Sequence, residues 1–146
     1  MFHKAVFLLL FAIAPTHLIA QNWVTHLDEA QQIASKNNQT IILVFQGSDW
    51  CAPCIKLDRE VWSTDLFKDY AKDHYVMLQA DFPRKKKNRL PESQATANAT
   101  LAEKYNPNGI FPFVVVLDKD GNALGKTSYK KMKASEYIEH LNSFKS

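Results

Sequence analysis

The spacing of hydrophobic residues changes repeatedly along the chain, and these changes predict the order of its elements. Helical spacing runs from 25 to 38, and an unbroken apolar, β-branched run follows at 40–45. The same succession returns at 55–71 and 75–81. Helical spacing indicates a helix with one buried face, whereas an apolar run without polar alternation is typical of a strand buried on both faces. The first half of the domain is therefore predicted to be two helix–strand units.

The second half predicts a helix, a β-hairpin and a closing helix. Helical spacing covers 92–105, and two short strands at 112–117 and 123–128 flank the turn Asp118-Lys-Asp-Gly-Asn122. A last helix is expected at 134–144. The order α-β-α-β-α-β-β-α indicates an α/β fold with a central mixed sheet and helices on both of its faces.

Two local features refine this picture. Ser63 is a candidate N-cap that restarts the helix within 55–71. Aromatic residues at helical or strand spacing, Trp62, Phe67, Tyr70 and Tyr75, are interpreted as core and given no binding role.

The first twenty residues have the pattern of a signal peptide. His3 and Lys4 precede an apolar run at 5–14, which has about half of the roughly 20 residues that span a bilayer. This length favours a cleaved leader over a retained anchor. We expect cleavage after Ala20, with Ala12-Ile-Ala14 as an alternative site, and one domain at 21–146. The mature chain would be periplasmic or secreted, without stable insertion in a membrane.

The net charge of the chain does not indicate any particular class of binding partner. The chain has a net charge of +3, which falls to +2 when Lys4 leaves with the leader. The one basic run, Arg84-Lys85-Lys86-Lys87-Asn88-Arg89, is interpreted as a solvated loop, because nucleic-acid binding usually shows a concentrated basic face with aromatic or motif support. No nucleic-acid partner is expected.

The two cysteines, Cys51 and Cys54, are the strongest chemical signal. A stabilising disulfide usually closes a longer loop, so a pair three residues apart indicates redox chemistry. At a helix start, free N–H groups favour a Cys51 thiolate, and Cys54, one turn later, can resolve a mixed disulfide. Pro53 fits the first helical turn. We expect Cys51 to be exposed and Cys54 to be protected.

Metal binding is the main alternative for a C-x-x-C pair. A closed zinc site needs about four ligands, and the mature chain adds only His26, His74 and His140, none spaced as a ligand pair. A copper-carrying role stays open but has no further support. We expect no metal and no cofactor.

Several motifs together resemble a known family. Trp50-Cys-Ala-Pro-Cys54 after a buried strand resembles the thioredoxin active site, and Gly109-Ile-Phe-Pro112 resembles the cis-proline loop of that family. The similarity extends over roughly residues 24 to 144. Gly47-Ser-Asp-Trp-Cys with Asp81-Phe-Pro-Arg-Lys-Lys is most similar to exported bacterial thioredoxin-like proteins.

The resemblance implies a thioredoxin fold and a protein-disulfide oxidoreductase. Cys51 would be the attacking cysteine, Cys54 the resolving one, and Trp50 the aromatic flank of the site. Pro112 would follow a cis peptide bond, and the backbone of Phe111 would pair with an extended substrate. The implied partners are protein thiols and disulfides and a redox partner protein.

The chain departs from the family at the residues that assist Cys54. Phe45 stands where thioredoxin has a buried aspartate, and Met77 or a neighbour stands where its lysine partner is expected. Asp58, just beyond Cys54, is a possible proton relay through water, and Glu60 is a second candidate. We predict a reductase rather than an oxidase. The alternative is a peptide-binding or chaperone module with little turnover.

Overall fold

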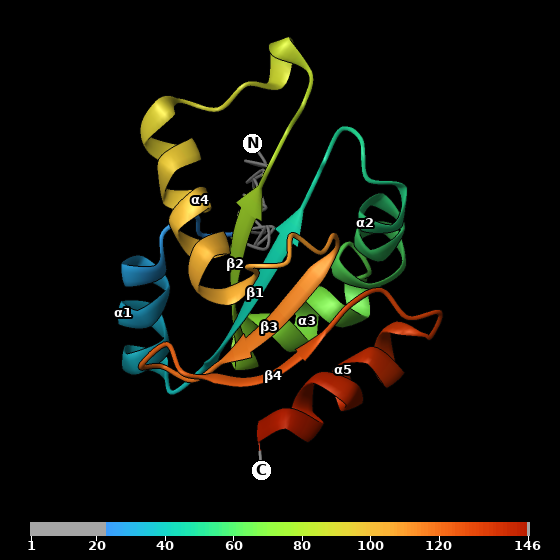
Figure 1. Cartoon of the computed structure of the whole chain (residues 1–146). Helices are drawn as coiled ribbons and strands as arrows, with labels where there is room; N and C mark the ends of the chain where they lie inside the picture. The colour runs from blue at the N-terminus through green and yellow to red at the C-terminus, as the bar shows by residue number, and fades with distance from the viewer. Residues whose placement is uncertain (1–22, 146) are drawn as a thin grey trace, which may run out of the picture.

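The computed structural model describes residues 23–145, so the predicted leader lies outside the described residues. Its elements follow the predicted order (Figure 1): α1 Leu27–Asn37, β1 Thr40–Gln46, α2 Ala52–Leu57, α3 Asp65–His74, β2 Tyr75–Asp81, α4 Glu92–Tyr105, β3 Phe113–Leu117, β4 Ala123–Thr127 and α5 Ala134–Asn142. The α/β prediction is confirmed. Within residues 23–145, no helix combines the length and the apolar character that crossing a membrane requires.

The four strands form one mixed sheet in the order β2-β1-β3-β4. β1 runs parallel to β2, with Gln46 opposite Asp81, and antiparallel to β3, with Phe45 opposite Phe113. β3 and β4 form the predicted hairpin. The last residues of β1 and β2 therefore meet the first residue of β3 at one edge of the sheet (Figure 1), and the loops of the candidate site leave from this edge.

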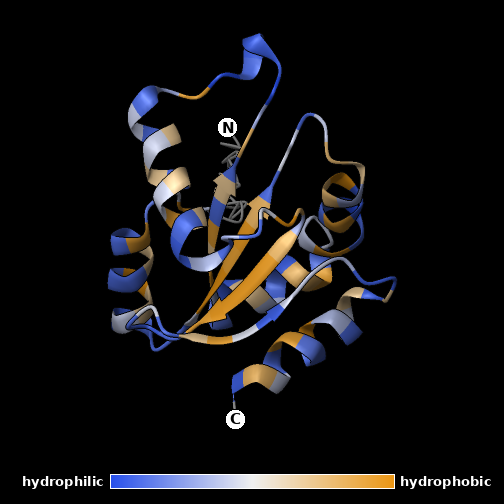
Figure 2. Ribbon diagram, in the orientation of Figure 1, coloured by the Kyte–Doolittle hydropathy of each residue, from blue (hydrophilic) through white to orange (hydrophobic). Residues whose placement is uncertain are grey.

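Helices cover both faces of the sheet and enclose two hydrophobic cores. One face packs against α2, α3 and α5, and the other packs against α1 and α4. Figure 2 shows hydrophobic strands in the centre and helices whose surfaces are partly polar. Alternate residues of β1 point into different cores, with Ile42 and Val44 in the first and Ile41, Leu43 and Phe45 in the second. This two-sided burial is why the sequence of β1 shows no polar alternation.

Trp62 lies at the centre of the first core and is only 1% exposed. Its ring makes edge contacts with Trp23, Phe67 and Tyr137 at centroid distances of 6.2, 4.8 and 5.4 Å. Tyr75 is also buried, and Tyr70 packs against this core while partly exposed. The interpretation of these aromatics as core residues is confirmed.

The predicted helix over 55–71 is in fact interrupted. A π-helical segment, Asp58–Trp62, follows α2, and α3 then starts anew. Ser63 ends the first segment, so its assignment as the N-cap was wrong. The cap is Thr64, whose extended backbone lets Oγ1 accept a hydrogen bond from the N–H of Phe67 at 3.3 Å. The final helix ends at Asn142 and continues as a 3-10 turn, Ser143–Lys145, beyond the predicted bound.

Thr64→Ala should lower the free energy of unfolding by about 1 kcal/mol, the usual effect of removing a helix N-cap. Ser63→Ala is the matched control, since this exposed neighbour does not cap α3, and it should change stability by less than about 0.5 kcal/mol. Urea unfolding followed by circular dichroism measures both. Equal losses in the two variants would contradict the assignment of the cap.

Candidate active site

A disulfide between Cys51 and Cys54 stands at the start of α2. Cys51 is the N-cap of this helix, and the N–H of Cys54 points to the Cys51 sulfur at 3.3 Å. Pro53 lies in the first turn, where its missing N–H leaves no helical hydrogen bond unmade. An N–H group directed at Cys51 Sγ stabilises negative charge on that sulfur once the disulfide opens.

The expected difference in exposure between the two cysteines is wrong for this disulfide state. Both are 4% exposed. A position at a helix start does not by itself leave a sulfur open, because the Cys51 sulfur is bonded to that of Cys54. The two cysteines differ instead in what surrounds their sulfurs. Cys51 Sγ accepts the backbone N–H of Cys54, and Cys54 lines a pocket that is described below.

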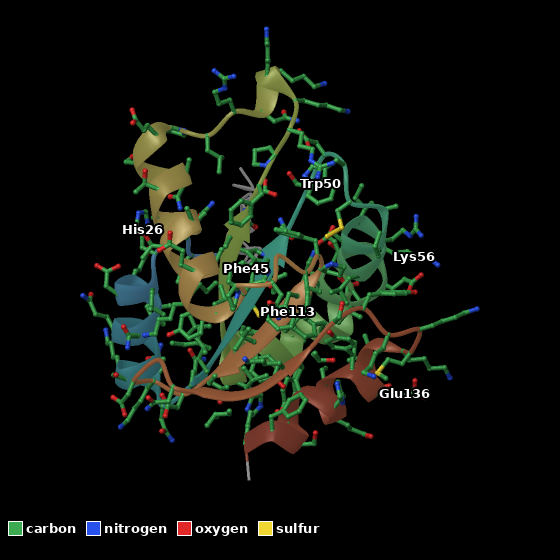
Figure 3. All side chains as sticks on the ribbon, in the orientation of Figure 1. His26, Phe45, Trp50, Lys56, Phe113 and Glu136 are labelled. Atoms are coloured by element: carbon green, nitrogen blue, oxygen red, sulfur yellow. A yellow bond between two sulfur atoms is a disulfide. The ribbon has the colours of Figure 1, made fainter. Side chains whose placement is uncertain are left out.

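Trp50, next to Cys51, is held in one position by four contacts. Its indole N–H donates to the carbonyl oxygen of Phe82 at 2.7 Å. The Arg84 guanidinium lies over the ring at 3.6 Å from the centroid, and the Phe111 ring meets it edge-on at 5.4 Å. A Cβ at Gly47 would overlap the indole, so only glycine allows this packing. Figure 3 shows Trp50 beside the disulfide.

The loop before β3 lies against the same tryptophan. The Phe111–Pro112 peptide bond is cis, and the Ser128 hydroxyl donates to the Pro112 carbonyl at 2.5 Å. The Phe111 ring also contacts Phe82, with centroids 5.5 Å apart. Since Phe111 touches Trp50 and each is adjacent in sequence to a site residue, the structure brings the cis-proline loop and the cysteine pair together.

Two aspartates that the sequence analysis did not single out anchor the loop before α2. Asp81 accepts hydrogen bonds from the Ser48 N–H and hydroxyl at 2.9 and 2.6 Å. Asp49 accepts from the N–H groups of Arg84 and Lys85 at 3.0 Å each and from the Asn88 side chain at 2.9 Å. Both stand in motifs quoted above for the family resemblance, and each lies at or after the end of a strand, but neither was given a role. These bonds tie the 47–51 loop to the 82–89 loop.

The pKa of Asp49 is lowered to about 2, chiefly because its carboxylate accepts the N–H of Arg84, with a further contribution from Asn88. A folded-state pKa below the ordinary value of 3.8 means that these contacts stabilise the loop above that pH. The stabilisation is lost as the pH falls through about 2. The anchor is therefore intact at any pH near neutrality.

Asp49→Ala should free the backbone amides of Arg84 and Lys85, which then exchange with solvent at least about tenfold faster, because each N–H group loses its charged acceptor. Hydrogen exchange read residue by residue by NMR measures this. Asp120→Ala, in the turn between β3 and β4, is the control and should leave both amides unchanged. Unaltered exchange in Asp49→Ala would show that other contacts hold the loop.

Cys54 faces a pocket of about 340 Å³. Its other lining residues come from the segment before α1, from β1 and the loop after it, from α2 and the π-helical segment, and from β2: Trp23, Gln46, Ser48, Ile55, Asp58 and Gln79. Phe45 lies on the opposite face of the sheet, fully buried against Phe113, and supplies no polar group to Cys54. Asp58 is thus the carboxylate that lines this pocket, as its possible relay role requires.

Among residues 23–145 there is no group of three or more histidine, cysteine, aspartate or glutamate side chains arranged to hold a metal ion.

Comparisons with known proteins agree with this geometry. A family model described as thioredoxin-like matches residues 22–119. The "Disulfide bond reductase DsbH" of Chlamydia pneumoniae is 33% identical over 115 residues, which cover 79% of this chain and 68% of the relative. The "Thiol:disulfide interchange protein DsbD" of Pasteurella multocida is 24% identical over 124 residues, 84% of this chain but only 20% of that protein.

Solved structures show the same fold. A structure of "DsbH Oxidoreductase" superposes with a TM-score of 0.78 at 29% identity and covers 95% of this chain and 94% of the other. A thioredoxin from Thermus thermophilus has a TM-score of 0.60 at 18% identity, with 84% and 85% of the two chains covered, and shows the likeness of the fold alone. With its C-x-x-C disulfide at a helix start, this chain belongs to the thioredoxin-like family, as a thiol-disulfide oxidoreductase.

Proposed function

We propose that the chain is an exported reductase of protein disulfides. The observation that carries the proposal is the Cys51–Cys54 disulfide, with the Cys54 N–H directed at Cys51 Sγ, beside the cis-proline loop. The similarity to a disulfide bond reductase of Chlamydia pneumoniae supports the same direction of transfer. The chain acts in its dithiol form, and the disulfide seen here is the product state.

The exchange proceeds in two steps. The Cys51 thiolate attacks one sulfur of a substrate disulfide, so that this bond breaks, a mixed disulfide forms and one substrate thiolate leaves. The Cys54 thiolate then attacks Cys51 Sγ, which releases the second substrate thiol and forms the disulfide of the structure. A dithiol on a redox partner protein restores the pair by the same chemistry.

Substrate chains would bind along the cis-proline loop. Ile55, next to Cys54, and Ile110, in the cis-proline loop, are 48% and 44% exposed, which offers apolar contacts to an unfolded or extended segment. Trp50 and Phe111 form one wall, and the Phe111 backbone would pair with the segment as an added strand. These contacts require an extended substrate segment but select no particular sequence.

The environment of Cys51 favours a reductant. Ala52 and Pro53 place no cation and no imidazole between the sulfurs, so the thiolate is stabilised mainly by the helix start. A strong oxidant needs an unusually stable thiolate and has a potential of about −120 mV, whereas thioredoxin lies at about −270 mV. We expect a value in the reducing half of this range.

Equilibration with glutathione and reduction of insulin disulfides by the mature domain test this proposal together. A potential above about −150 mV, with faster oxidation of reduced unfolded chains than reduction of insulin, would reverse the direction. Stoichiometric binding of unfolded chains without turnover would instead support the peptide-binding or chaperone alternative.

Asp58→Asn should slow the second step about tenfold at neutral pH, because Cys54 must lose a proton and the carboxylate lines its pocket. The rate at which a preformed mixed disulfide on Cys51 decays measures this, and the deficit should shrink as rising pH ionises the thiol without help. Asp69→Asn, exposed on α3, is the matched control. Decay at the wild-type rate would remove Asp58 from the mechanism.

Export rests on the leader pattern of residues 1–20. Expression of the full chain in a bacterium with two membranes, followed by N-terminal sequencing of periplasmic protein, should find Gln21 as the first residue. Recovery of uncleaved protein in the cytoplasmic fraction would contradict both the leader and the periplasmic location.

A further inference from the structure

The segment 84–89, here called the basic loop, is an exposed cluster of positive charge. It contains Arg84, Lys85, Lys86, Lys87 and Arg89, has no acidic residue within it, and carries a 3-10 turn at Lys86–Asn88. All six of its residues are exposed. Figure 2 shows this loop as a hydrophilic projection beyond the sheet. A run of this kind is commonly just solvated, so its position decides whether it has a role.

The basic loop is fixed to the loop that carries the cysteines. Asp49 accepts three hydrogen bonds from it, at 2.9 to 3.0 Å, and the Arg84 guanidinium covers the Trp50 ring. Trp50 and Asp49 precede Cys51 directly in sequence. A partner bound to the basic loop would therefore lie next to Trp50, the residue that precedes Cys51.

The anchoring also leaves the charge available. The negative charge of Asp49 offsets one of the five positive charges of the loop. Its hydrogen bonds go to two backbone N–H groups and to the Asn88 side chain, not to the charged ends of the lysine and arginine side chains. Lys86 and Lys87 are both exposed. Figure 3 shows nitrogen-tipped side chains pointing outward around this projecting loop. The loop therefore combines a fixed backbone with charged side chains open to a partner.

We propose that the basic loop is a docking surface for protein substrates whose disulfide is flanked by aspartate and glutamate side chains. The inference rests on the proposed function and adds a substrate preference to it. Complementary charge beside a reactive group raises the rate of encounter and selects among partners more than it adds binding energy. The apolar contacts of the cis-proline loop would then accept the extended chain itself.

A protein partner fits the observations better than a nucleic acid does. Binding of single strands needs aromatic faces on which bases stack. Arg84 already covers one face of Trp50, and the basic loop itself contains no aromatic residue. Anionic lipid headgroups would be attracted by the same charge, so the experiment includes them as a competing outcome.

The test uses two synthetic peptides that share one intramolecular disulfide and differ only in flanking residues, with glutamate in one and lysine in the other. The readout is the ratio of their second-order rate constants with the reduced mature domain. Both react at Cys51, so any general change in its reactivity cancels. We expect the glutamate peptide to react about tenfold faster at low salt and the ratio to approach one at high salt, where screening shortens the reach of the charges.

Two double variants distinguish the effect of the basic loop from the effect of the net charge of the protein. K86E/K87E should reduce the ratio to within about twofold of one. K36E/K119E changes the net charge equally but places it at the opposite end of the sheet, since Lys36 precedes β1 and Lys119 follows β3. This control should keep the wild-type ratio.

A wild-type ratio near one, or an equal loss in both variants, would overturn the docking surface. So would a K86E/K87E variant that keeps its ratio but no longer binds phosphatidylglycerol vesicles, because the loop would then serve a membrane surface. Failure of the wild-type protein to reduce either peptide at any salt concentration would instead refute the proposed function.

Discussion

Cys51→Ser should reduce the rate of insulin disulfide reduction to that of the chemical reductant alone. A serine hydroxyl is not ionised near neutral pH and forms no disulfide, so the first attack has no nucleophile. Turbidity of reduced insulin in the presence of a small dithiol measures the loss. The variant should keep its fold, since a disulfide that closes three residues adds little stability.

Cys54→Ser is the informative companion to this variant. It keeps the nucleophile but lacks the resolving thiol, so it should accumulate covalent complexes with substrates, whereas Cys51→Ser should accumulate none. Non-reducing electrophoresis after reaction with a disulfide-containing protein shows the complexes. Trapping by Cys51→Ser alone would exchange the roles of the two cysteines, and undiminished turnover in Cys51→Ser would end the assignment of the site.

Trp62→Ala should lower the free energy of unfolding by about 3–5 kcal/mol, the usual range for removing a large buried aromatic side chain. The ring is enclosed by Trp23, Phe67 and Tyr137, and the π-helical segment that carries it joins α2 to α3. A cavity there would affect both the core and the helix that begins with the cysteines. Urea unfolding of the oxidised protein measures the loss.

Leu66→Ala is the control for this prediction. Leu66 lies one turn further along the chain but is 52% exposed, so its truncation should change stability by no more than about 0.5 kcal/mol. A loss below about 1.5 kcal/mol for Trp62→Ala would show that the surrounding side chains collapse into the space.

The local elements of this protein could be predicted because their signals are local. Spacing of apolar residues separates the helices from the strands, and α4 begins and ends at the predicted residues. The turn Asp118–Asn122 joins the strands of the hairpin, as its composition indicated. The break between α2 and α3 was less accessible, since a serine and a threonine stand side by side and only backbone conformation selects Thr64.

The cysteine pair was also identifiable from the sequence, and its two sulfurs are joined at the start of α2. Their equal burial was not, because spacing along a helix says which residues share a face and nothing about the loops that cover that face. The side chains around Cys54 come from four separate parts of the chain, so they too lay beyond the reach of local patterns.

The sequence by itself thus determined the order of elements, the hydrophobic faces and the reactive pair, all of which follow from interactions within one turn of helix or between neighbouring residues of a strand. The tertiary structure alone decided how loops distant in sequence meet. Asp49 reaches Asn88, 39 residues away, because β1 and β2 lie parallel with Gln46 opposite Asp81, so their following loops leave the sheet together. That register arises from packing of the whole sheet between its helices, and it is what places the basic loop against Asp49 and Trp50, the two residues before Cys51.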